Sequence, residues 1–457
     1  MSTRAAVAAA NVGRTSSSFS TGDVTKNPLT RSAGADVNKV DNKGWTPLHH
    51  AARKGDIDIA KQLICLGADV NETRRKDGST ALHYAAKNGH LEVTKILVSE
   101  EANVQWLQKG DDNGLTALQY ASKNGHLEVT KFLVIKGADV HKGNSNGLTA
   151  LHHASKNGHL EVTKFLVSED ANVHKGDDNG LSALHYAAKN GHLNVTKFLV
   201  CKGADLDMGD DNGLTTLHYA AKNGNFRVTK FLISKGADVH KGDNNGLSAL
   251  QYAAWSDNVN VTKHLVSKGA EVNKGDIDGR TALHIAAKNG HINVTKFLIS
   301  KGADVHKGDN NGVTSLHSAA KNGHLNVTKF LVCKGANLDM GDDNGLTTLH
   351  YAAKNGNFRV TKFLISKGAD VHKGDNNGLS ALHYAAWSDN VNVTKHLVSK
   401  GAEVNKGDID GRTALHIAAK NGHINVTKFL ISKGADVHKE DTNGVTSLHS
   451  AAKNGHL

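Results

Sequence analysis

The sequence predicts an all-α fold in which one short repeat is copied along the chain and stacked into a solenoid. Thirteen glycines occupy equivalent positions, with first steps of 34 and 36 residues and a strict step of 33 afterwards. A period of this length, held over so many copies, is typical of repeats that pack mainly on their neighbours. Each repeat also contains two short stretches of helical periodicity that end at glycine. The marker glycines are Gly44, Gly78, Gly114, Gly147, Gly180, Gly213, Gly246, Gly279, Gly312, Gly345, Gly378, Gly411 and Gly444.

The repeat at residues 180–212 shows how the first helix is specified. Ser182 is a favourable N-cap, because its hydroxyl can accept a hydrogen bond from the first turn. Leu184, Ala187 and Ala188 then recur at helical spacing and predict one apolar face, on which the paired alanines allow a close neighbour. A glycine supplies the left-handed residue that ends the helix.

The second helix of the same repeat has a stronger apolar face. Val195, Phe198 and Leu199 are expected inward, and Thr196 and Lys197 outward. Each helix spans only eight or nine residues, which is marginal for an isolated helix in water, so stacking must stabilise it. The polar segment that follows predicts a hairpin-like finger leading to the next repeat.

The pattern G-x-T-x-L-H-x-A-A-x-x-G-H, followed by V-x-x-F-L-V-x-K-G-A-D-V, resembles the ankyrin repeat from Gly44 to Leu457. The resemblance implies a curved stack with fingers and first helices on the concave side and second helices on the convex side. It also implies a chain that binds other proteins, as an adaptor or scaffold. Only the first copy keeps proline before the Leu-His pair, at Pro47, where a first helical turn tolerates it.

The expected organisation is a disordered leader with a degenerate partial repeat at residues 1–31 and a single array at 32–457. The leader contains Arg4, Arg14 and many Ser and Thr residues, with no acid before Asp23. That composition also fits a transit peptide, which stays an alternative. Because the last repeat stops after its first helix, we expect the chain to be a fragment of a longer protein.

A second, longer period is superimposed on the first. Residues 187–325 recur as residues 319–457 at an offset of 132, which is four repeats, so a block of four has been duplicated. The copies differ at only four pairs of positions: Asp205 and Asn337, Gln251 and His383, Gly308 and Glu440, and Asn310 and Thr442.

Bulk properties indicate a reducing, cytoplasmic location, with nuclear or membrane association only through partners. The three cysteines lie several repeats apart, which argues against a disulfide framework. No apolar run approaches the ~18 residues that a membrane span needs. We expect a monomeric array.

No catalytic, cofactor-binding or metal-binding residues are expected. Catalysis needs unlike groups that converge on one point, whereas this chain repeats the same groups. The first-helix histidines, such as His83 and His185, are expected to bond the hydroxyl three residues earlier and loop backbone. The finger histidines occur once per repeat, and copies about 10 Å apart cannot share a metal ion.

The chain carries a formal charge of +11, and lysines recur on the second helix. Nucleic-acid binding favours aromatic side chains interleaved with basic ones, and none is expected on that face. Other proteins are therefore the expected partners. The alternatives are a basic solenoid that binds nucleic acid or an anionic membrane surface, or the repeat region of a larger signalling, channel or enzyme protein. The second-helix lysines include Lys164, Lys197, Lys230, Lys263 and Lys296.

Candidate protein-binding residues lie where the repeat departs from its own pattern. Trp255 and Trp387 each stand where other repeats have an exposed lysine, and the glycine that normally ends this helix is missing after them. After Trp255, Asp257 or Asn258 must therefore make the turn. Exposed tryptophan is typical of binding hot spots; alternatively, the ring covers the uncapped loop. Two further candidates are irregular connectors. One holds Trp106 and Leu107, which either tuck back onto the stack or project toward a partner, and the other holds Arg74, Arg75 and Lys76.

A row of leucines after the marker glycines is expected to be partly exposed and to form a contact stripe. The alternative is that these leucines pack on one another between the fingers. The tyrosines before the Ala-Ala pair are expected to pack between helices, with the hydroxyl reaching water. The candidate leucines are Leu115, Leu148, Leu181, Leu214 and Leu247.

Overall fold

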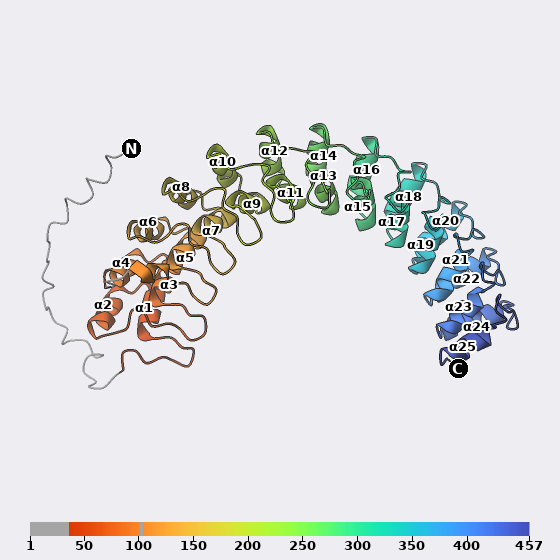
Figure 1. Cartoon of the computed structure of the whole chain (residues 1–457), viewed down its shortest axis with the longest axis horizontal. Helices are drawn as coiled ribbons and strands as arrows, with labels where there is room; N and C mark the ends of the chain where they lie inside the picture. The colour runs from red at the N-terminus through yellow and green to blue at the C-terminus, as the bar shows by residue number, and fades with distance from the viewer. Residues whose placement is uncertain (1–35, 101–103, 457) are drawn as a thin grey trace. The chain divides into compact units, whose positions relative to one another are not determined.

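The computed structural model describes residues 36–100 and 104–456. In these residues the chain forms 25 α-helices and one short 3-10 helix, with isolated β-bridges and no β-strand (Figure 1). The predicted all-α class is confirmed. The predicted leader at residues 1–31 lies outside the described residues. The chain divides into two compact units, residues 1–139 and 140–457, and each is described by itself.

The described part of the first unit contains three helix pairs, with the 3-10 helix η3 in the long connector after the second pair. Each pair corresponds to one predicted repeat, beginning three residues after its marker glycine. The elements are α1 (Pro47–Lys54), α2 (Ile57–Cys65), α3 (Ala81–Asn88), α4 (Leu91–Ser99), η3 (Val104–Gln108), α5 (Ala117–Asn124) and α6 (Leu127–Ile135).

The described part of the second unit contains nine helix pairs and a single last helix, and odd-numbered helices are the first helices of their repeats. The elements are α7 (Ala150–Asn157), α8 (Leu160–Ser168), α9 (Ala183–Lys189), α10 (Leu193–Cys201), α11 (Thr216–Lys222), α12 (Phe226–Ser234), α13 (Ala249–Trp255), α14 (Val259–Ser267), α15 (Ala282–Asn289), α16 (Ile292–Ser300), α17 (Ser315–Lys321), α18 (Leu325–Cys333), α19 (Thr348–Lys354), α20 (Phe358–Ser366), α21 (Ala381–Trp387), α22 (Val391–Ser399), α23 (Ala414–Lys420), α24 (Ile424–Ser432) and α25 (Ser447–Lys453).

Neighbouring repeats of the second unit stack through both of their helices, but more closely through the first helices. The reason is side-chain size: Ala187 and Ala188 of α9 are fully buried, and alanine lets helix backbones approach. In Figure 1 the first helices of this unit accordingly lie on the inner side of its curved row. This placement agrees with what the resemblance implies.

The core of a repeat contains most of the residues that the helical pattern predicts, but Phe198, which is expected inward, is only half-buried. Leu184, Val195 and Leu199 are at most 1% exposed. The prediction that Thr196 faces outward is wrong, because this side chain is fully buried. It can be buried because its hydroxyl donates to the carbonyl of His192, one turn earlier, at 3.0 Å.

The chain turns sharply between the two helices of a repeat through a residue with positive φ. In most repeats this residue is glycine, such as Gly191 at φ 78°. In the tryptophan-containing repeats it is Asp257, at φ 56°, and its copy Asp389, at φ 53°. Of the two residues considered for the first of these turns, Asp257 therefore makes it, and aspartate is one of the few non-glycine residues that tolerate this region.

Candidate functional site

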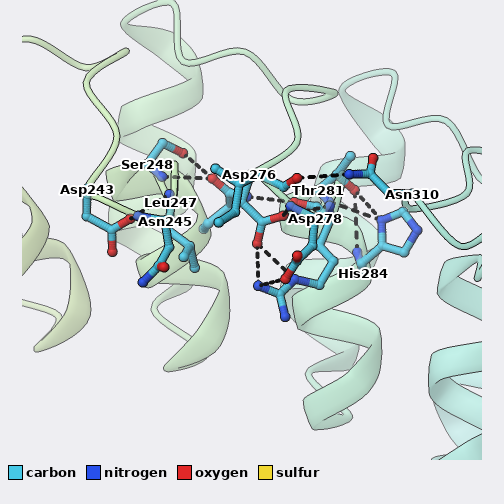
Figure 2. Close-up of polar contacts among 12 residues, drawn as sticks. Asp243, Asn245, Leu247, Ser248, Asp276, Asp278, Thr281, His284 and Asn310 are labelled. Carbon is cyan, nitrogen blue, oxygen red and sulfur yellow. Dashed lines mark hydrogen bonds and ion pairs between the residues drawn. The ribbon is translucent and has the colours of Figure 1, made fainter. Parts of the chain in front are cut away.

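Most fingers are organised by an aspartate that closes a tight turn. Figure 2 shows Asp243, whose Oδ1 accepts backbone N–H groups from Asn245 at 2.9 Å and Leu247 at 2.8 Å. Gly246, between these donors, has φ 75°, which a residue with a side chain rarely adopts. The aspartate thus fixes the chain directly before the first helix.

The fingers of successive repeats are joined by hydrogen bonds. The N–H of Ile277 donates to the carbonyl of Asn245 at 3.0 Å, and the N–H of Asn310 donates to the carbonyl of Asp278 at 2.9 Å. The side-chain amide of Asn310 also donates to the carbonyl of Ile277 at 2.8 Å. These links hold the finger tips in a row, so side chains placed on them keep a defined spacing.

In most repeats a buried histidine fastens the first helix to the next finger. The Nδ1 atom of His284 accepts the backbone N–H of Thr281 at 3.1 Å and lies 2.8 Å from its hydroxyl (Figure 2). Because Nδ1 is the acceptor, Nε2 carries the proton and donates to the carbonyl of Val313 at 3.0 Å. Burial lowers the pKa of His284, which keeps the ring neutral. The predicted hydrogen bonds of the first-helix histidines are confirmed.

All seven tyrosines of the chain occupy one position, directly before the Ala-Ala or Ala-Ser pair of the first helix. We call it the tyrosine position. The hydroxyl of Tyr219 donates to Oδ2 of the finger residue Asp210 at 2.6 Å, so the prediction that it reaches water is wrong. Its ring contacts His185 edge-on, with centroids 5.8 Å apart, and Lys189 Nζ lies 5.2 Å from its centroid. The seven residues are Tyr84, Tyr120, Tyr186, Tyr219, Tyr252, Tyr351 and Tyr384.

The leucines after the marker glycines do not form an exposed stripe, so that prediction is wrong. The five candidate leucines are only 7–9% exposed, and four of them pack with tyrosines of the same buried cluster. In the second unit Leu148, Leu181, Leu214 and Leu247 share one cluster with three tyrosines and Ile285. The alternative, in which the leucines pack between fingers, describes the structure. The leucines whose predicted exposure is wrong are Leu115, Leu148, Leu181, Leu214 and Leu247.

This regular surface is interrupted at α15 and α17. The repeat of α15 has Arg280 in place of the leucine and Ile285 at the tyrosine position. Arg280 Nε donates to Oδ2 of Asp276 at 2.8 Å, where a tyrosine hydroxyl donates in other repeats. The next repeat has only Ser318 at the tyrosine position. Two neighbouring repeats therefore lack the aromatic ring.

The missing rings leave a groove of about 410 Å³ beside an exposed tryptophan. Trp255 is 51% exposed, and its ring is parallel to that of Tyr252, with centroids 6.4 Å apart. We call this the first tryptophan groove. It is lined by Asn245, Leu247, Tyr252, Trp255, Arg280, His284, Ile285, Lys288, Asn289, Asp309 and Ser318.

The first tryptophan groove has an apolar base with charges of both signs around it. Arg280 Nη2 lies 2.7 Å from Asp276 and 2.9 Å from Asp278, and its hydrogen bond with Asp276 raises the pKa of the guanidinium. Lys288 is exposed and Asp309 is half-buried. Apolar area with a few polar groups at its edge is the usual composition of a peptide-binding surface.

The duplicated block contains the groove a second time. The second tryptophan groove has a volume of about 110 Å³, and each of its lining residues is the copy, 132 positions later, of a residue in the first. Trp387 is 54% exposed. The lining residues are Leu379, Trp387, Arg412, His416, Ile417, Lys420, Asn421 and Ser450.

The loop after each tryptophan is closed without the indole ring. The N–H of Asn258 donates to the carbonyl of Ala253 at 3.0 Å, and His291 of the next repeat bonds the carbonyl of Trp255 at 2.8 Å. His423 bonds the carbonyl of Trp387 at the same distance. Backbone groups and a histidine therefore hold this turn.

In the first unit, the long connector folds back onto its own repeats. Leu107 in η3 is 4% exposed, so of the two positions expected for this residue it takes the one against the stack. Gln108 anchors this turn by donating to the carbonyl of Gly137 at 2.8 Å. Trp106 is half-buried and lies under the ammonium group of Lys109, at 4.4 Å from the ring centroid.

The predicted basic cluster has only two freely exposed members. The guanidinium of Arg74 lies 4.7 Å from the ring centroid of Trp45 and bonds Asp77 at 2.8 Å, with 12% of its side chain exposed. Arg74 therefore packs within the first unit. Arg75 and Lys76 are exposed.

The prediction that the second-helix lysines lack aromatic neighbours is wrong. Lys197 Nζ lies 5.9 Å from the ring centroid of Phe231, and Lys296 lies at the same distance from Phe330. Both phenylalanines are half-buried, and each lies beside the lysine of the preceding repeat. This face is therefore basic and partly aromatic.

Among residues 36–100 and 104–456, no group of three or more His, Cys, Asp and Glu side chains could hold a metal ion. No helix in this part of the chain is long and apolar enough to cross a membrane. The three cysteines are exposed thiols.

Comparison with known proteins identifies the class of this chain. The model of ankyrin repeats in three copies matches residues 69–144, 131–210, 204–276, 272–342, 334–408 and 405–457, and the single ankyrin repeat matches 43–75. The chain belongs to the ankyrin-repeat family, whose repeats mediate protein–protein interaction.

Individual relatives share only short segments. Protein phosphatase 1 regulatory subunit 27 is 55% identical over 40 residues in Homo sapiens and 58% over 36 in Mus musculus, covering 9% and 8% of this chain. Phytochrome-interacting ankyrin-repeat protein 2 of Arabidopsis thaliana is 59% identical over 32 residues, or 7% of this chain. These segments cover 26%, 23% and 18% of the relatives, so the chain spans about a quarter or less of the curated relatives it matches.

Sequence reasoning found the tryptophans but missed the residues that form the groove beside them. Arg280, Ile285 and Ser318 were not singled out, nor were their copies. A signal was present: in the same two repeats the leucine row and the tyrosine position are both interrupted. Each interruption alone looks like ordinary variation, and only the stacked structure brings them together beside Trp255.

Proposed function

We propose that this chain is a non-catalytic adaptor that binds partner proteins on its finger and first-helix surface, with the tryptophan grooves as the main contact points. The observation that carries this proposal is the exposure of Trp255 and Trp387, each beside a groove of the same composition. A half-exposed tryptophan is costly in water and contributes strongly when a partner covers it. A cytoplasmic, monomeric array remains our prediction.

The names of the relatives support an adaptor role without identifying a partner. One is a regulatory subunit of a phosphatase and another is phytochrome-interacting. Both descriptions concern proteins that act by binding other proteins. Because the shared segments are short, neither phosphatase 1 nor phytochrome is proposed as a partner here.

Selection from a random peptide library displayed on phage tests the proposal. The chain itself supplies a replacement that folds, because other repeats such as that of α9 carry lysine at the tryptophan position, as Lys189. Peptides selected on the wild-type chain should lose at least tenfold in affinity for the Trp255→Lys/Trp387→Lys variant, with an unchanged helical circular dichroism signal. The control, Lys189→Ala, alters the same position in a repeat without a groove and should bind as wild type. Equal binding to the double variant would refute the proposal.

The alternative, a nucleic-acid partner, is favoured by one observation, the phenylalanine rings beside the second-helix lysines. Stacking on aromatic rings between basic groups is how single strands are held without sequence preference. Titration of a fluorescent single-stranded oligonucleotide from low to high salt separates the two functions. Tight binding at low salt with a steep logarithmic salt slope, reduced by Phe231→Ala/Phe330→Ala, would favour nucleic acid.

A further inference from the structure

We propose that the first tryptophan groove receives a tyrosine side chain of the partner, in the slot that Ser318 leaves open at the tyrosine position. This inference rests on the proposed function, because it assigns the chemistry of the group that the groove binds. The argument comes from the chain's own seven tyrosines, which show what surrounds such a ring in this solenoid.

Three side chains contact the ring at a filled tyrosine position in the second unit. For Tyr219 they are His185, Lys189 and Asp210, which lie 34, 30 and 9 residues earlier. Tyr384 has the same surroundings, with its hydroxyl 2.7 Å from Asp375. Histidine meets the edge of the ring, lysine lies over its face, and aspartate accepts the phenolic hydrogen bond.

The slot at Ser318 keeps all three of these side chains. The residues 34, 30 and 9 positions before Ser318 are His284, Lys288 and Asp309, and each of them lines the first tryptophan groove. The slot therefore retains the surroundings of a tyrosine and lacks only the ring. An apolar cavity of ~150 Å³ accepts benzene, so a groove of about 410 Å³ has room for a phenol.

Asp309 gives the slot its preference for a phenol. Its Oδ1 accepts the N–H groups of Asn311 at 2.9 Å and Val313 at 3.0 Å, as in other fingers. Among the described residues, none donates a hydrogen bond to its Oδ2, the oxygen that receives the tyrosine hydroxyl elsewhere. A tyrosine of the partner can donate to it, whereas phenylalanine cannot. A phosphotyrosine lacks the hydroxyl hydrogen and brings negative charge against the carboxylate.

A second slot, at Ser450, has the same composition. His416, Lys420 and Asp441 stand 34, 30 and 9 residues before Ser450. Its groove is smaller, at about 110 Å³. The partner we infer is therefore a protein segment that presents an unmodified tyrosine, with further contacts to the neighbouring tryptophan.

Three analogues of side chains test the slot directly in the full chain. They are p-cresol for tyrosine, toluene for phenylalanine and p-tolyl phosphate for phosphotyrosine, and the readout is the methyl resonance of Ile285, which lines the groove. We expect p-cresol to shift this resonance saturably, with a dissociation constant on the order of millimolar. Toluene and p-tolyl phosphate should bind at least about tenfold more weakly.

Ser318→Tyr/Ser450→Tyr is the decisive variant, because it fills both slots with the residue that seven other repeats carry. It should keep the fold and abolish the response to p-cresol. Asp309→Asn is the second variant, and Asn144 provides a natural precedent for asparagine in this turn. It should reduce the preference for p-cresol over toluene.

Two results would overturn the inference. One is a response of the Ile285 methyl to p-cresol that survives in Ser318→Tyr/Ser450→Tyr. The other is a wild-type chain that binds toluene or p-tolyl phosphate as well as p-cresol, or binds none of them. In that case peptide binding that still depends on Trp255 and Trp387 would leave the proposed function standing, which separates the two failures.

Discussion

At the scale of single residues, the tyrosine position connects the stability of the repeats to the binding surface. Tyr219 and Asp210 form a nearly buried pair in which the hydroxyl satisfies a carboxylate oxygen. Where tyrosine is replaced, the chain uses other solutions: Arg280 bonds Asp276 directly, and Asp309 stays more exposed. The tyrosine–aspartate pair that joins finger and helix in other repeats thus shows which group the open slot lacks.

Tyr219→Phe should lower the free energy of unfolding of the chain by about 1–3 kcal/mol, because Asp210 loses a donor while it is 7% exposed. Urea denaturation measures the change. A double-mutant cycle with Asp210→Asn isolates the pair. Strict additivity of the two single changes would show that the hydrogen bond does not contribute.

The buried histidines should make the solenoid sensitive to acid. Burial lowers the pKa of His350 to about 4, whereas an unfolded chain has a histidine pKa near 6.5. Between these values the unfolded state binds more protons, so stability is complete above pH 6.5 and falls as the pH decreases toward 4. One such residue contributes up to about 3 kcal/mol at 1.36 kcal/mol per pKa unit.

His350→Gln should remove this residue's share of the acid sensitivity while keeping its hydrogen bonds. Gln251 shows that glutamine fits the position, since it accepts the N–H of Ser248 at 2.8 Å and donates to the carbonyl of Arg280 at 2.7 Å. Denaturant midpoints from pH 7.5 to 4.5 measure the effect. A variant with the pH slope of the wild type would contradict the assignment.

At the scale of the helices, the turn residues limit how closely repeats can stack. A Cβ added at Gly290 would lie 2.5 Å from Nδ1 of His324 in the next repeat, whereas one added at Gly302 meets nothing within 4 Å. Both glycines have positive φ, at 80° and 86°. Comparing them separates the backbone requirement from the packing between repeats.

Gly302→Ala should lower the free energy of unfolding by about 1–2 kcal/mol, the cost of a left-handed alanine. Gly290→Ala should lower it further, because His324 must also move from its hydrogen bond with the carbonyl of Lys288. Thermal and urea denaturation of the two variants measure the difference. Equal losses would show that the histidine adapts freely.

The helices were predictable from sequence, whereas the surface was predictable only in part. Glycine spacing and the apolar pattern of Leu184 and Val195 predicted the helix pairs, because these signals are local. Whether Thr196 and the row of leucines are buried depends on which neighbouring side chains fill the space around them. The sequence of a single repeat does not specify this. The exposed tryptophans were predictable as departures from the pattern, but the groove needs two repeats in contact.

At the scale of the whole molecule, duplication of four repeats has placed two equivalent grooves in the second unit. Helices pack 8–10 Å apart, so four repeats separate the grooves by about 40 Å. A flexible linker of about 50 residues has a comparable root-mean-square length. A partner with two copies of the recognised segment could therefore occupy both grooves at once.

Two copies of a selected peptide joined by such a Gly/Ser linker should bind about 10²–10⁴ times more tightly than one copy. Trp387→Lys should return the affinity of the tandem peptide to that of the single peptide. Isothermal titration calorimetry gives both affinity and stoichiometry. A tandem peptide that binds no better than the single one would mean that the grooves act separately.

The central claim is that partners bind to the tryptophan grooves and not to the second-helix face. The most direct test is the isoleucine methyl spectrum of the chain with a peptide selected on it, because this residue type marks both faces. Ile285 and Ile417 line the grooves, whereas Ile233, Ile299 and Ile365 lie on second helices. We predict that the peptide shifts the first two resonances and leaves the other three in place. Shifts confined to Ile233, Ile299 and Ile365 would contradict the account.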